Sequence, residues 1–442
     1  MLIRATIIFI LILLLPVYPQ DVLKIMPLGD SITRGATGEP DDSGNAGYRK
    51  ALYDSLRSLG YRSSLEEGTD FDFVGSQTTT YSGSYIFDKD HEGRSGWSIS
   101  CDTSGSILHN IKDFLSLNTP DVILLHIGTN DISSNDNIET MVSELNSLID
   151  SIHDFNQDIH IILSKLVYRI YPDSLIDSTK KFNSFVENMA INRITNNSKL
   201  HLVNAGEDFI YIIDKTPPYT GDMWDNLHPN YSGYRKMAKV WFNKLKELLT
   251  PALAFPEDNN QNISEAVTLS WFPALGANSY KIEIAEDVNF NNLFNEYSIT
   301  DTFLFVPGLE PNTTYYWRVS AKINTGYSPF SNIRSFKTFD PVLVMEDNVP
   351  GSNYLYQNYP NPFNPSTTIR FAVKKGGYTK VNLYDILGNK IDVLFDEYVE
   401  ENRVREINFE ADRHLASGSY FYEIIINGEE NFREVKKMTL IR

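Results

Sequence analysis

Short apolar runs alternate with longer segments of helical spacing through residues 21–250, and this alternation restricts the fold more than any other feature. The strand-like runs are Leu23–Leu28, Phe71–Gly75, Val122–Ile127, Ile159–Leu166 and Leu200–Asn204. The helix-like segments are Tyr48–Leu59, Ile107–Leu117, Ile138–Ile152, Thr179–Ile194 and Tyr234–Leu249. Helices of this length between strands predict an α/β fold, in which a parallel sheet carries helices on both faces. Ligands of such sheets lie beyond the carboxyl ends of the strands, so the turn after Leu28 is a candidate site.

The pattern changes after residue 250. Pro251, Pro256 and the polar run 257–262 predict a linker at 251–262. Residues 263–339 then alternate apolar and polar side chains in short runs, which predicts a β-sandwich. A second predicted linker, 340–353, precedes another strand-rich unit at 354–442, for which we expect a second β-sandwich. A chain of 442 residues is long enough for several such domains.

The N-terminus and the charge indicate where the chain works. Arg4 followed by the apolar run Ile7–Leu15 predicts a signal peptide over residues 1–20, and this run is too short to span a membrane. We expect no transmembrane segment elsewhere. The net charge of −18 argues against nucleic acid as a partner, because nucleic-acid binding needs clustered Lys and Arg. The single cysteine, Cys101, excludes intrachain disulfides. An exported, soluble protein is expected.

Two polar blocks of residues 21–250 contain candidates for nucleophilic catalysis. Ser31 follows the first strand in a turn that can expose its hydroxyl, although a lone turn serine is more often a capping residue. Asp225 precedes His228 by three residues in the loop that enters the last helix. The carboxylate can therefore accept Nδ1–H of the imidazole and leave Nε2 free as a base.

Two further blocks offer hydrogen-bond donors for an oxyanion. Gly128-Thr129-Asn130-Asp131 follows the third apolar run, and the amide of Asn130 can donate there. The alternative interpretation of this block is a plain turn with a helix cap. The block His91–Ser98 contains glycines whose backbone N–H groups can also donate. The sequence has no Gly-x-Ser-x-Gly elbow, no metal-ligand spacing and no Gly-rich phosphate loop, so we expect neither a metal nor a cofactor.

Taken together, the four blocks resemble the SGNH hydrolases, also called the GDSL esterase/lipase superfamily. The resemblance implies a flavodoxin-like three-layer αβα sheet. It implies that Ser31 is the nucleophile, His228 the base and Asp225 the acid that orients it. The first block reads Asp-Ser-Ile where the family name has Asp-Ser-Leu.

The same resemblance implies an oxyanion hole. Its donors would be the backbone N–H groups of Ser31 and Gly96 and the side-chain amide of Asn130. Gly93 is the alternative glycine. Residues 47–49, 71–76 and 91–97 look most like the carbohydrate-esterase branch that includes acetyl xylan esterases.

The expected reaction is two-step ester hydrolysis through an acyl-enzyme, on an acylated polysaccharide or oligosaccharide such as acetylated xylan. Trp97, Trp224 and Tyr48 are candidates for stacking on sugar rings, with core packing as the alternative for each. Two other functions remain open. One is a lipase, lysophospholipase or thioesterase that uses the same three residues, and the other is a non-catalytic carbohydrate-binding or adhesion protein.

The two C-terminal units also show resemblances. Residues 263–339 resemble a fibronectin type III module through Trp271 and the tyrosine-corner pattern 309–315, which reads Leu-Glu-Pro-Asn-Thr-Thr-Tyr. Residues 354–442 resemble the C-terminal sorting domain of type IX secretion cargo, through 357–366, 383–388 and 415–420. This resemblance implies type IX secretion machinery as a partner. It also implies export through the periplasm and outer membrane of a Gram-negative bacterium, to the cell surface or the medium.

Overall fold

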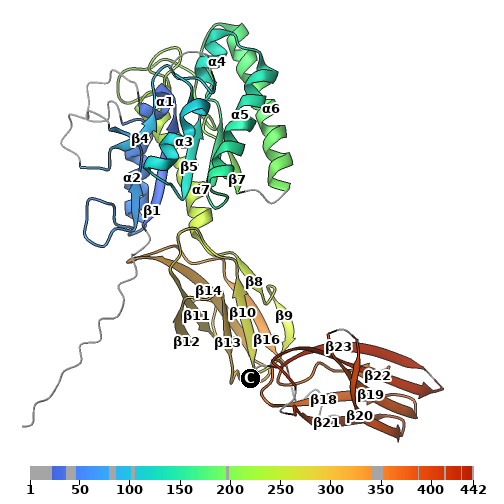
Figure 1. Cartoon of the computed structure of the whole chain (residues 1–442). Helices are drawn as coiled ribbons and strands as arrows, with labels where there is room; N and C mark the ends of the chain where they lie inside the picture. The colour runs from blue at the N-terminus through green and yellow to red at the C-terminus, as the bar shows by residue number, and fades with distance from the viewer. Residues whose placement is uncertain are drawn as a thin grey trace, which may run out of the picture.

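The computed structural model describes residues 22–35, 46–78, 86–100, 105–195, 199–339, 352–386, 388–412, 415–429 and 431–440. The predicted signal peptide, Cys101 and nearly all of the predicted second linker lie outside these residues. Figure 1 shows three units in a row: an α/β unit, a middle β-unit and a C-terminal β-unit. Within the described part of the chain, no helix is both long and apolar enough to cross a membrane.

The α/β unit is built on one seven-stranded sheet of order β3-β4-β1-β5-β6-β7, with β2 also paired to β1. Its strands are β1 (Leu23–Gly29), β2 (Phe71–Phe73), β3 (Gln77–Thr78), β4 (Asp90–Gly93), β5 (Val122–His126), β6 (His160–Lys165) and β7 (Leu200–Asn204). All pairs are parallel except β3 with β4. Because β2 and β4 share one side of β1, the order is that of a flavodoxin-like sheet, as predicted.

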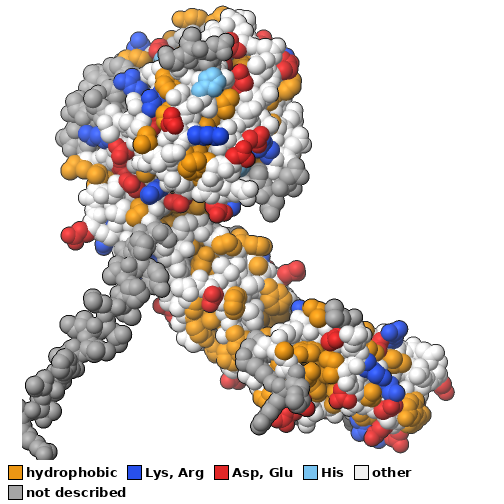
Figure 2. All heavy atoms as spheres, in the orientation of Figure 1, with side chains coloured by type: hydrophobic (Ala, Val, Ile, Leu, Met, Phe, Trp, Pro, Cys, Tyr) orange, Lys and Arg blue, Asp and Glu red, His pale blue; other side chains and the backbone are white. Residues whose placement is uncertain are grey.

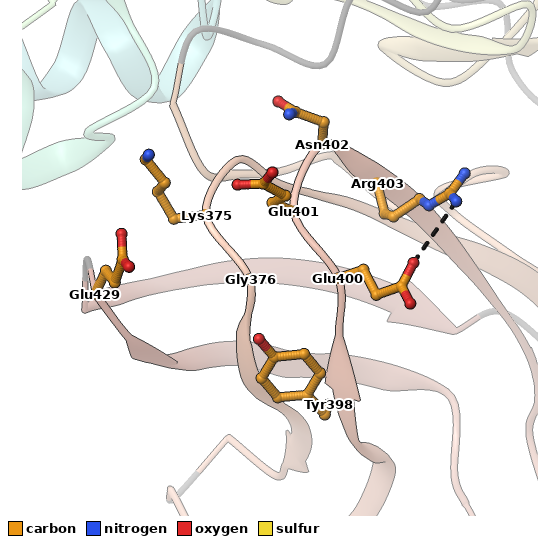
Figure 3. Close-up of a pocket in the computed structure, with 8 residues that line it drawn as sticks. All are labelled: Lys375, Gly376, Tyr398, Glu400, Glu401, Asn402, Arg403 and Glu429. Carbon is orange, nitrogen blue, oxygen red and sulfur yellow. Dashed lines mark ion pairs between the residues drawn. The ribbon is translucent and has the colours of Figure 1, made fainter.

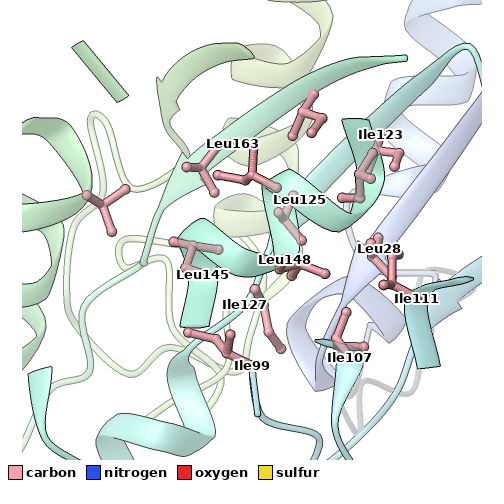
Figure 4. Close-up of a cluster of buried hydrophobic side chains, with 14 of the residues drawn as sticks. Leu28, Ile99, Ile107, Ile111, Ile123, Leu125, Ile127, Leu145, Leu148 and Leu163 are labelled. Carbon is pink, nitrogen blue, oxygen red and sulfur yellow. The ribbon is translucent and has the colours of Figure 1, made fainter. Parts of the chain in front are cut away.

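Helices cover both faces of this sheet and enclose two separate cores. They are α1 (Ser31–Arg34), α2 (Arg49–Ser58), α3 (Ile107–Leu117), α4 (Thr129–Ser134), α5 (Ile138–Phe155), α6 (Asp173–Thr195) and α7 (Tyr231–Leu249). The apolar faces of α2 and α7 pack on one side of the sheet, and those of α3, α5 and α6 on the other. Figure 4 shows part of the second core, where Leu145 and Leu148 of α5 meet Leu125 of β5. Every residue of β5 is buried, including His126 after the apolar run Val122–Leu125, as expected for a strand covered on both faces.

Strand β4 had no apolar signal in the sequence. It reads Asp-His-Glu-Gly, yet its last three residues are buried. Its buried polar side chains are hydrogen-bonded: Nδ1 of His91 accepts the amide of Gly93 at 3.0 Å, and the carboxylate of Glu92 accepts the amide of Ser76 at 2.8 Å. Hydrogen bonding therefore replaces apolar burial in this strand.

The middle unit is a β-sandwich of two sheets around one core. One sheet holds β8 (Leu253–Phe255), β10 (Val267–Trp271) and β13 (Phe303–Val306). The other holds β9 (Asn260–Ile263), β11 (Ser279–Ala285), β12 (Leu293–Ile299), β14 (Thr314–Ile323), β15 (Gly326–Tyr327) and β16 (Arg334–Thr338).

Strand β8 and the first three residues of β9 lie in the segment predicted as a linker, 251–262. Strand β8 pairs with β10 and β9 pairs with β16, so backbone hydrogen bonds order a stretch whose composition is typical of a loop. The hydroxyl of Tyr315 accepts the amide of Glu310 at 2.9 Å, which is the geometry of a tyrosine corner. The fibronectin type III assignment itself stays a prediction.

The C-terminal unit also has two antiparallel sheets around one core. The first holds β17 (Tyr354–Leu355), β18 (Ser366–Val373) and β21 (Arg403–Glu410). The second holds β19 (Gly377–Tyr384), β20 (Lys390–Val399), β22 (Gly418–Gly428) and β23 (Phe432–Leu440). The C-terminal half of the chain is thus mostly antiparallel β-structure, as predicted.

The middle unit is attached directly to the amino-terminal edge of the parallel sheet. Asp70, which precedes β2, is fully buried and accepts the amides of Thr325 and Gly326 in the β14–β15 turn at 2.7 and 2.9 Å. Ile323 of β14 belongs to the same apolar cluster as Leu23 of β1. The two units therefore share a core and a buried polar contact, at the end of the sheet opposite the carboxyl ends of its strands.

Candidate active site

Ser31 lies where β1 ends, at the first position of α1. The cap of this short helix is Asp30, whose carboxylate accepts the amide of Ile32 at 2.9 Å. Ser31 is therefore not needed as the capping residue, which was the alternative interpretation from sequence. Its side chain is mostly buried, and the hydroxyl points to a histidine 197 residues further along the chain.

That histidine is His228, and it links Ser31 to Asp225. The Oγ atom of Ser31 lies 3.0 Å from Nε2 of His228. Nδ1 of the same ring lies 2.9 Å from Oδ2 of Asp225. The loop closes on itself because the amide of Trp224 donates to the carbonyl of His228 at 2.8 Å. The three side chains, predicted from two separate blocks of sequence, thus form one continuous hydrogen-bonded chain.

The carboxylate of Asp225 is held in its charged form. Partial burial raises its pKa, but the His228 side chain and the backbone amides of His228 and Leu227 outweigh burial and lower the pKa to about 2. Both amides donate to Oδ1 at 2.7 Å, which leaves Oδ2 for the imidazole. An ionised Asp225 can therefore accept Nδ1–H of His228, and in that neutral tautomer Nε2 is the acceptor that faces Ser31.

Asn130 contacts the turn 94–97 beyond the carboxyl ends of β4 and β5. Nδ2 of Asn130 donates to the carbonyl of Trp97 at 2.7 Å, which uses one of its two N–H groups. The amide of Trp97 donates to the carbonyl of Arg94 at 3.2 Å and closes a tight turn. Gly96 occupies the third position of this turn with φ +79°, a conformation that favours glycine.

The two candidate glycines differ in what their amides do. Gly93 lies inside β4, and its N–H already donates to Nδ1 of His91. Gly96 is exposed, and a Cβ added there would have no atom within 4 Å. Of the two amides, the geometry leaves that of Gly96 for a bound group.

Asp131 holds the segment that follows this turn. It is fully buried, and its two carboxylate oxygens lie 3.0 and 3.2 Å from the amide of Ile99. Burial raises the pKa of Asp131 to about 7. The N-cap residue of α4 is Gly128, so Asp131 is not the helix cap of this block. Adjacent side chains, Asn130 and Asp131, thus hold residues 97 and 99.

Asn226 positions the loop of Asp225 and His228, and sequence reasoning did not identify it. Its side-chain oxygen accepts the amide of Tyr171, and its Nδ2 donates to the carbonyl of Tyr171, both at 2.7 Å. Its own carbonyl accepts the amide of Ile170 at 3.0 Å. The loop after β6 therefore holds the loop that carries His228. An asparagine inside a loop has no pattern that marks this contact between segments 55 residues apart.

The aromatic side chains suggested for sugar stacking are in different environments. Tyr48 is fully buried and packs against Trp241 with ring centroids 5.7 Å apart, so it is a core residue and cannot face a ligand. Trp97 is half-buried beneath the guanidinium of Arg94, 4.6 Å from the ring centroid. Trp224 is also half-buried and lies next to Asp225 in the chain.

A pocket in the C-terminal unit is separate from these residues. Figure 3 shows its walls at the turns that follow β18, β20 and β22, where Arg403 pairs with Glu400 at 3.6 Å. Its lining consists of Lys375, Gly376, Tyr398, Glu400, Glu401, Asn402, Arg403 and Glu429. None of the predicted site residues takes part, so this pocket belongs to the C-terminal unit alone.

Comparison with known proteins identifies two parts of the chain. Residues 25–241 match the family model GDSL-like Lipase/Acylhydrolase, and residues 357–440 match the model Secretion system C-terminal sorting domain. A multidomain esterase of Ruminococcus flavefaciens is 32% identical over 263 residues, which are 53% of this chain. This chain spans only 31% of that relative's length.

Two solved structures that are similar to the α/β unit are esterases. A family 3 carbohydrate esterase of Clostridium thermocellum is 31% identical, with a TM-score of 0.40 over 50% of this chain and 94% of that one. A variant of an acetyl xylan esterase from Geobacillus stearothermophilus is 17% identical, with a TM-score of 0.34 over 50% of this chain and 94% of that one. The chain therefore carries an SGNH (GDSL-like) lipase/acylhydrolase domain in its N-terminal half and a type IX secretion sorting domain at residues 357–440.

Proposed function

We propose that the protein is a serine esterase that removes acetyl groups from polysaccharides such as acetylated xylan. The observation that carries the proposal is the hydrogen-bonded chain Ser31–His228–Asp225 at the carboxyl end of β1. Ligands of parallel α/β sheets bind at this edge. Nucleophile, base and orienting acid are present in contact, as covalent catalysis by serine requires.

In the proposed reaction, Nε2 of His228 takes the hydroxyl proton as Ser31 Oγ attacks the acyl carbonyl. The tetrahedral intermediate collapses when His228 returns this proton to the leaving sugar oxygen, and an acetyl ester remains on Ser31. Water, activated by the same imidazole, then attacks the ester and releases acetate. The ionised Asp225 stabilises the imidazolium that forms in each half-reaction.

The oxyanion would be stabilised by three donors: the amides of Ser31 and Gly96 and the second N–H of Asn130. Two facts support this set. The amide of Gly93 is already bound to His91, and Trp97 uses only one N–H of Asn130. Loss of one such donor costs about 3–4 kcal/mol of transition-state stabilisation, roughly a hundred- to a thousandfold in rate.

Relatives and the sorting domain support the proposed substrate and location. The relatives include proteins named as a carbohydrate esterase and an acetyl xylan esterase. The sorting domain marks the chain as a secreted or cell-surface protein of Bacteroidetes-type bacteria. We place the enzyme outside the cell, after passage through the periplasm and the outer membrane, where it meets polymers that cannot enter. Residues 21–250 would be the catalytic domain and 263–339 a fibronectin type III-like module.

Acetate release from acetylated xylan by the secreted chain tests this proposal. Ser31→Ala and His228→Ala should each abolish acetate release with an unchanged melting temperature. Ser116→Ala and His109→Ala, both on the exposed side of α3, are matched controls that should keep full activity. An active Ser31→Ala variant would refute the proposed nucleophile.

A second assay separates the alternative functions. Aryl esters of increasing acyl length should be hydrolysed best at acetate if the enzyme is a deacetylase. A preference for long acyl chains would indicate a lipase or thioesterase instead. Glycan binding without hydrolysis of any ester would indicate a non-catalytic protein.

A further inference from the structure

The smaller sheet of the middle unit exposes phenylalanine rings to solvent. Phe255 of β8, Phe303 and Phe305 of β13, and Phe272 just after β10 have exposed fractions of 44, 56, 45 and 61%. We call these four residues the phenylalanine face. Figure 2 shows hydrophobic side chains gathered over the middle unit, in the region where Figure 1 places β10 and β13.

Strand register sets the spacing of the rings. Ser270 of β10 is paired with Phe255 on one side and with Phe303 on the other. Phe255 and Phe303 are therefore separated by two strand spacings, about 10 Å, with the half-buried Ser270 between them. Phe305, paired with Thr268, lies about 7 Å further along β13. The result is a row of aromatic rings with hydroxyl groups between them.

The core does not require these rings. Along β10 the inward side chains Val267, Leu269 and Trp271 are buried, and Val306 of β13 is buried with them. The phenylalanines point to the opposite side of the same sheet, where exposed positions usually carry polar or charged residues. A cluster of exposed aromatic rings on a secreted chain indicates a surface that binds a partner.

The charge of the face indicates which partner it fits. The three strands read Leu-Ala-Phe, Val-Thr-Leu-Ser-Trp and Phe-Leu-Phe-Val, with no ionisable side chain among them. The whole chain has a net charge of −18, which repels a second copy and an anionic lipid surface. A neutral polymer with apolar faces and hydroxyl groups matches both properties. Sugar rings have this chemistry, since their C–H faces stack on aromatic rings and their hydroxyls reach Ser and Thr.

We propose that the phenylalanine face is a second polysaccharide-binding site, separate from the Ser31 site. The choice of a neutral polysaccharide rests on the proposed function. Asp70 and Leu23 attach the middle unit to the α/β unit, so the bound polymer is held at a constant distance from Ser31. Binding at this face raises the local concentration of acetyl groups around the active site.

The site is tested by measuring how much protein insoluble, unacetylated xylan or cellulose removes from solution. The esterase cannot alter these polymers because they carry no acetyl groups. The variant is the full chain with Phe303→Thr and Phe305→Thr, since threonine suits a strand. The control, Tyr378→Thr with Tyr398→Thr, removes two exposed aromatic rings that are paired across strands of the C-terminal unit. The Phe variant should bind at least one polymer roughly tenfold more weakly, while the control binds as the parent does.

Hydrolysis of a soluble aryl acetate should be the same in all three proteins, so a failure of the esterase proposal and a failure of this one are distinguishable. Equal binding by parent and Phe variant to both polymers would overturn the proposal, as would equal losses in the Phe variant and the control. A Phe variant that differs from the parent only in oligomeric state, measured by light scattering, would assign the face to a second copy instead.

Discussion

Replacing Asp70 with asparagine should weaken the attachment of the middle unit to the α/β unit. Oδ1 of Asp70 accepts the amides of Thr325 and Gly326, and Oδ2 accepts the amide of Arg62 at 2.7 Å. An asparagine amide has one acceptor oxygen, so its NH2 group must face at least one of these backbone N–H groups. An unsatisfied buried donor costs about 1–3 kcal/mol, and the change of two charge-assisted bonds to neutral ones adds about 1 kcal/mol each.

The sum for Asp70→Asn is about 3–5 kcal/mol, which lowers the melting temperature by roughly 10 °C in a unit of this size. Thermal unfolding of the full chain, followed by calorimetry and by tryptophan fluorescence, measures it. The matched control is Asp54→Asn, which removes an exposed carboxylate paired with Lys50 on α2 and should cost about 0.5 kcal/mol or less. If Asp70→Asn melts within about 2 °C of the parent, the contact between the two units is not stabilising and the reasoning fails.

Two further predictions concern the loop of His228 and the response to acid. Asn226→Ala leaves both backbone groups of Tyr171 without their partner, so the loop that holds Asp225 and His228 should loosen; kcat should fall roughly ten- to a hundredfold with little change in KM. Steady-state kinetics on an aryl acetate measures this, and unchanged kcat would contradict it. Burial lowers the pKa of both His160 and His201, which lie 3.0 Å apart, to about 4. Because the folded state binds these protons less readily than the unfolded state, stability should fall as pH drops from about 6.5 toward 4. Between pH 7 and pH 4.5, the free energy of unfolding measured in urea should fall less for His201→Gln than for the parent. An equal fall in both proteins would refute this prediction.

Apolar patterning was sufficient to predict the architecture of the α/β unit. The runs at 23–28 and 122–127 form the central strands because parallel strands are buried on both faces and are therefore mostly apolar. Strand β4 was not predicted, because His91 and Glu92 are buried through hydrogen bonds rather than through apolar contact. The strands β8 and β9 were missed because their residues, next to prolines and asparagines, are ordered only by their neighbours in the sandwich.

The sequence by itself determined which chemistry is available: a serine after the first strand, an Asp three residues before a His, and an asparagine in a loop. These signals are local, since they depend on residue types and on spacings within one turn or one strand. Tertiary structure decided which of these groups meet. It brought Ser31 to His228 across 197 residues, engaged the amide of Gly93 with His91, and buried Tyr48. Such contacts are set by how strands and loops distant in the chain pack around one sheet, and no short stretch of sequence contains that information.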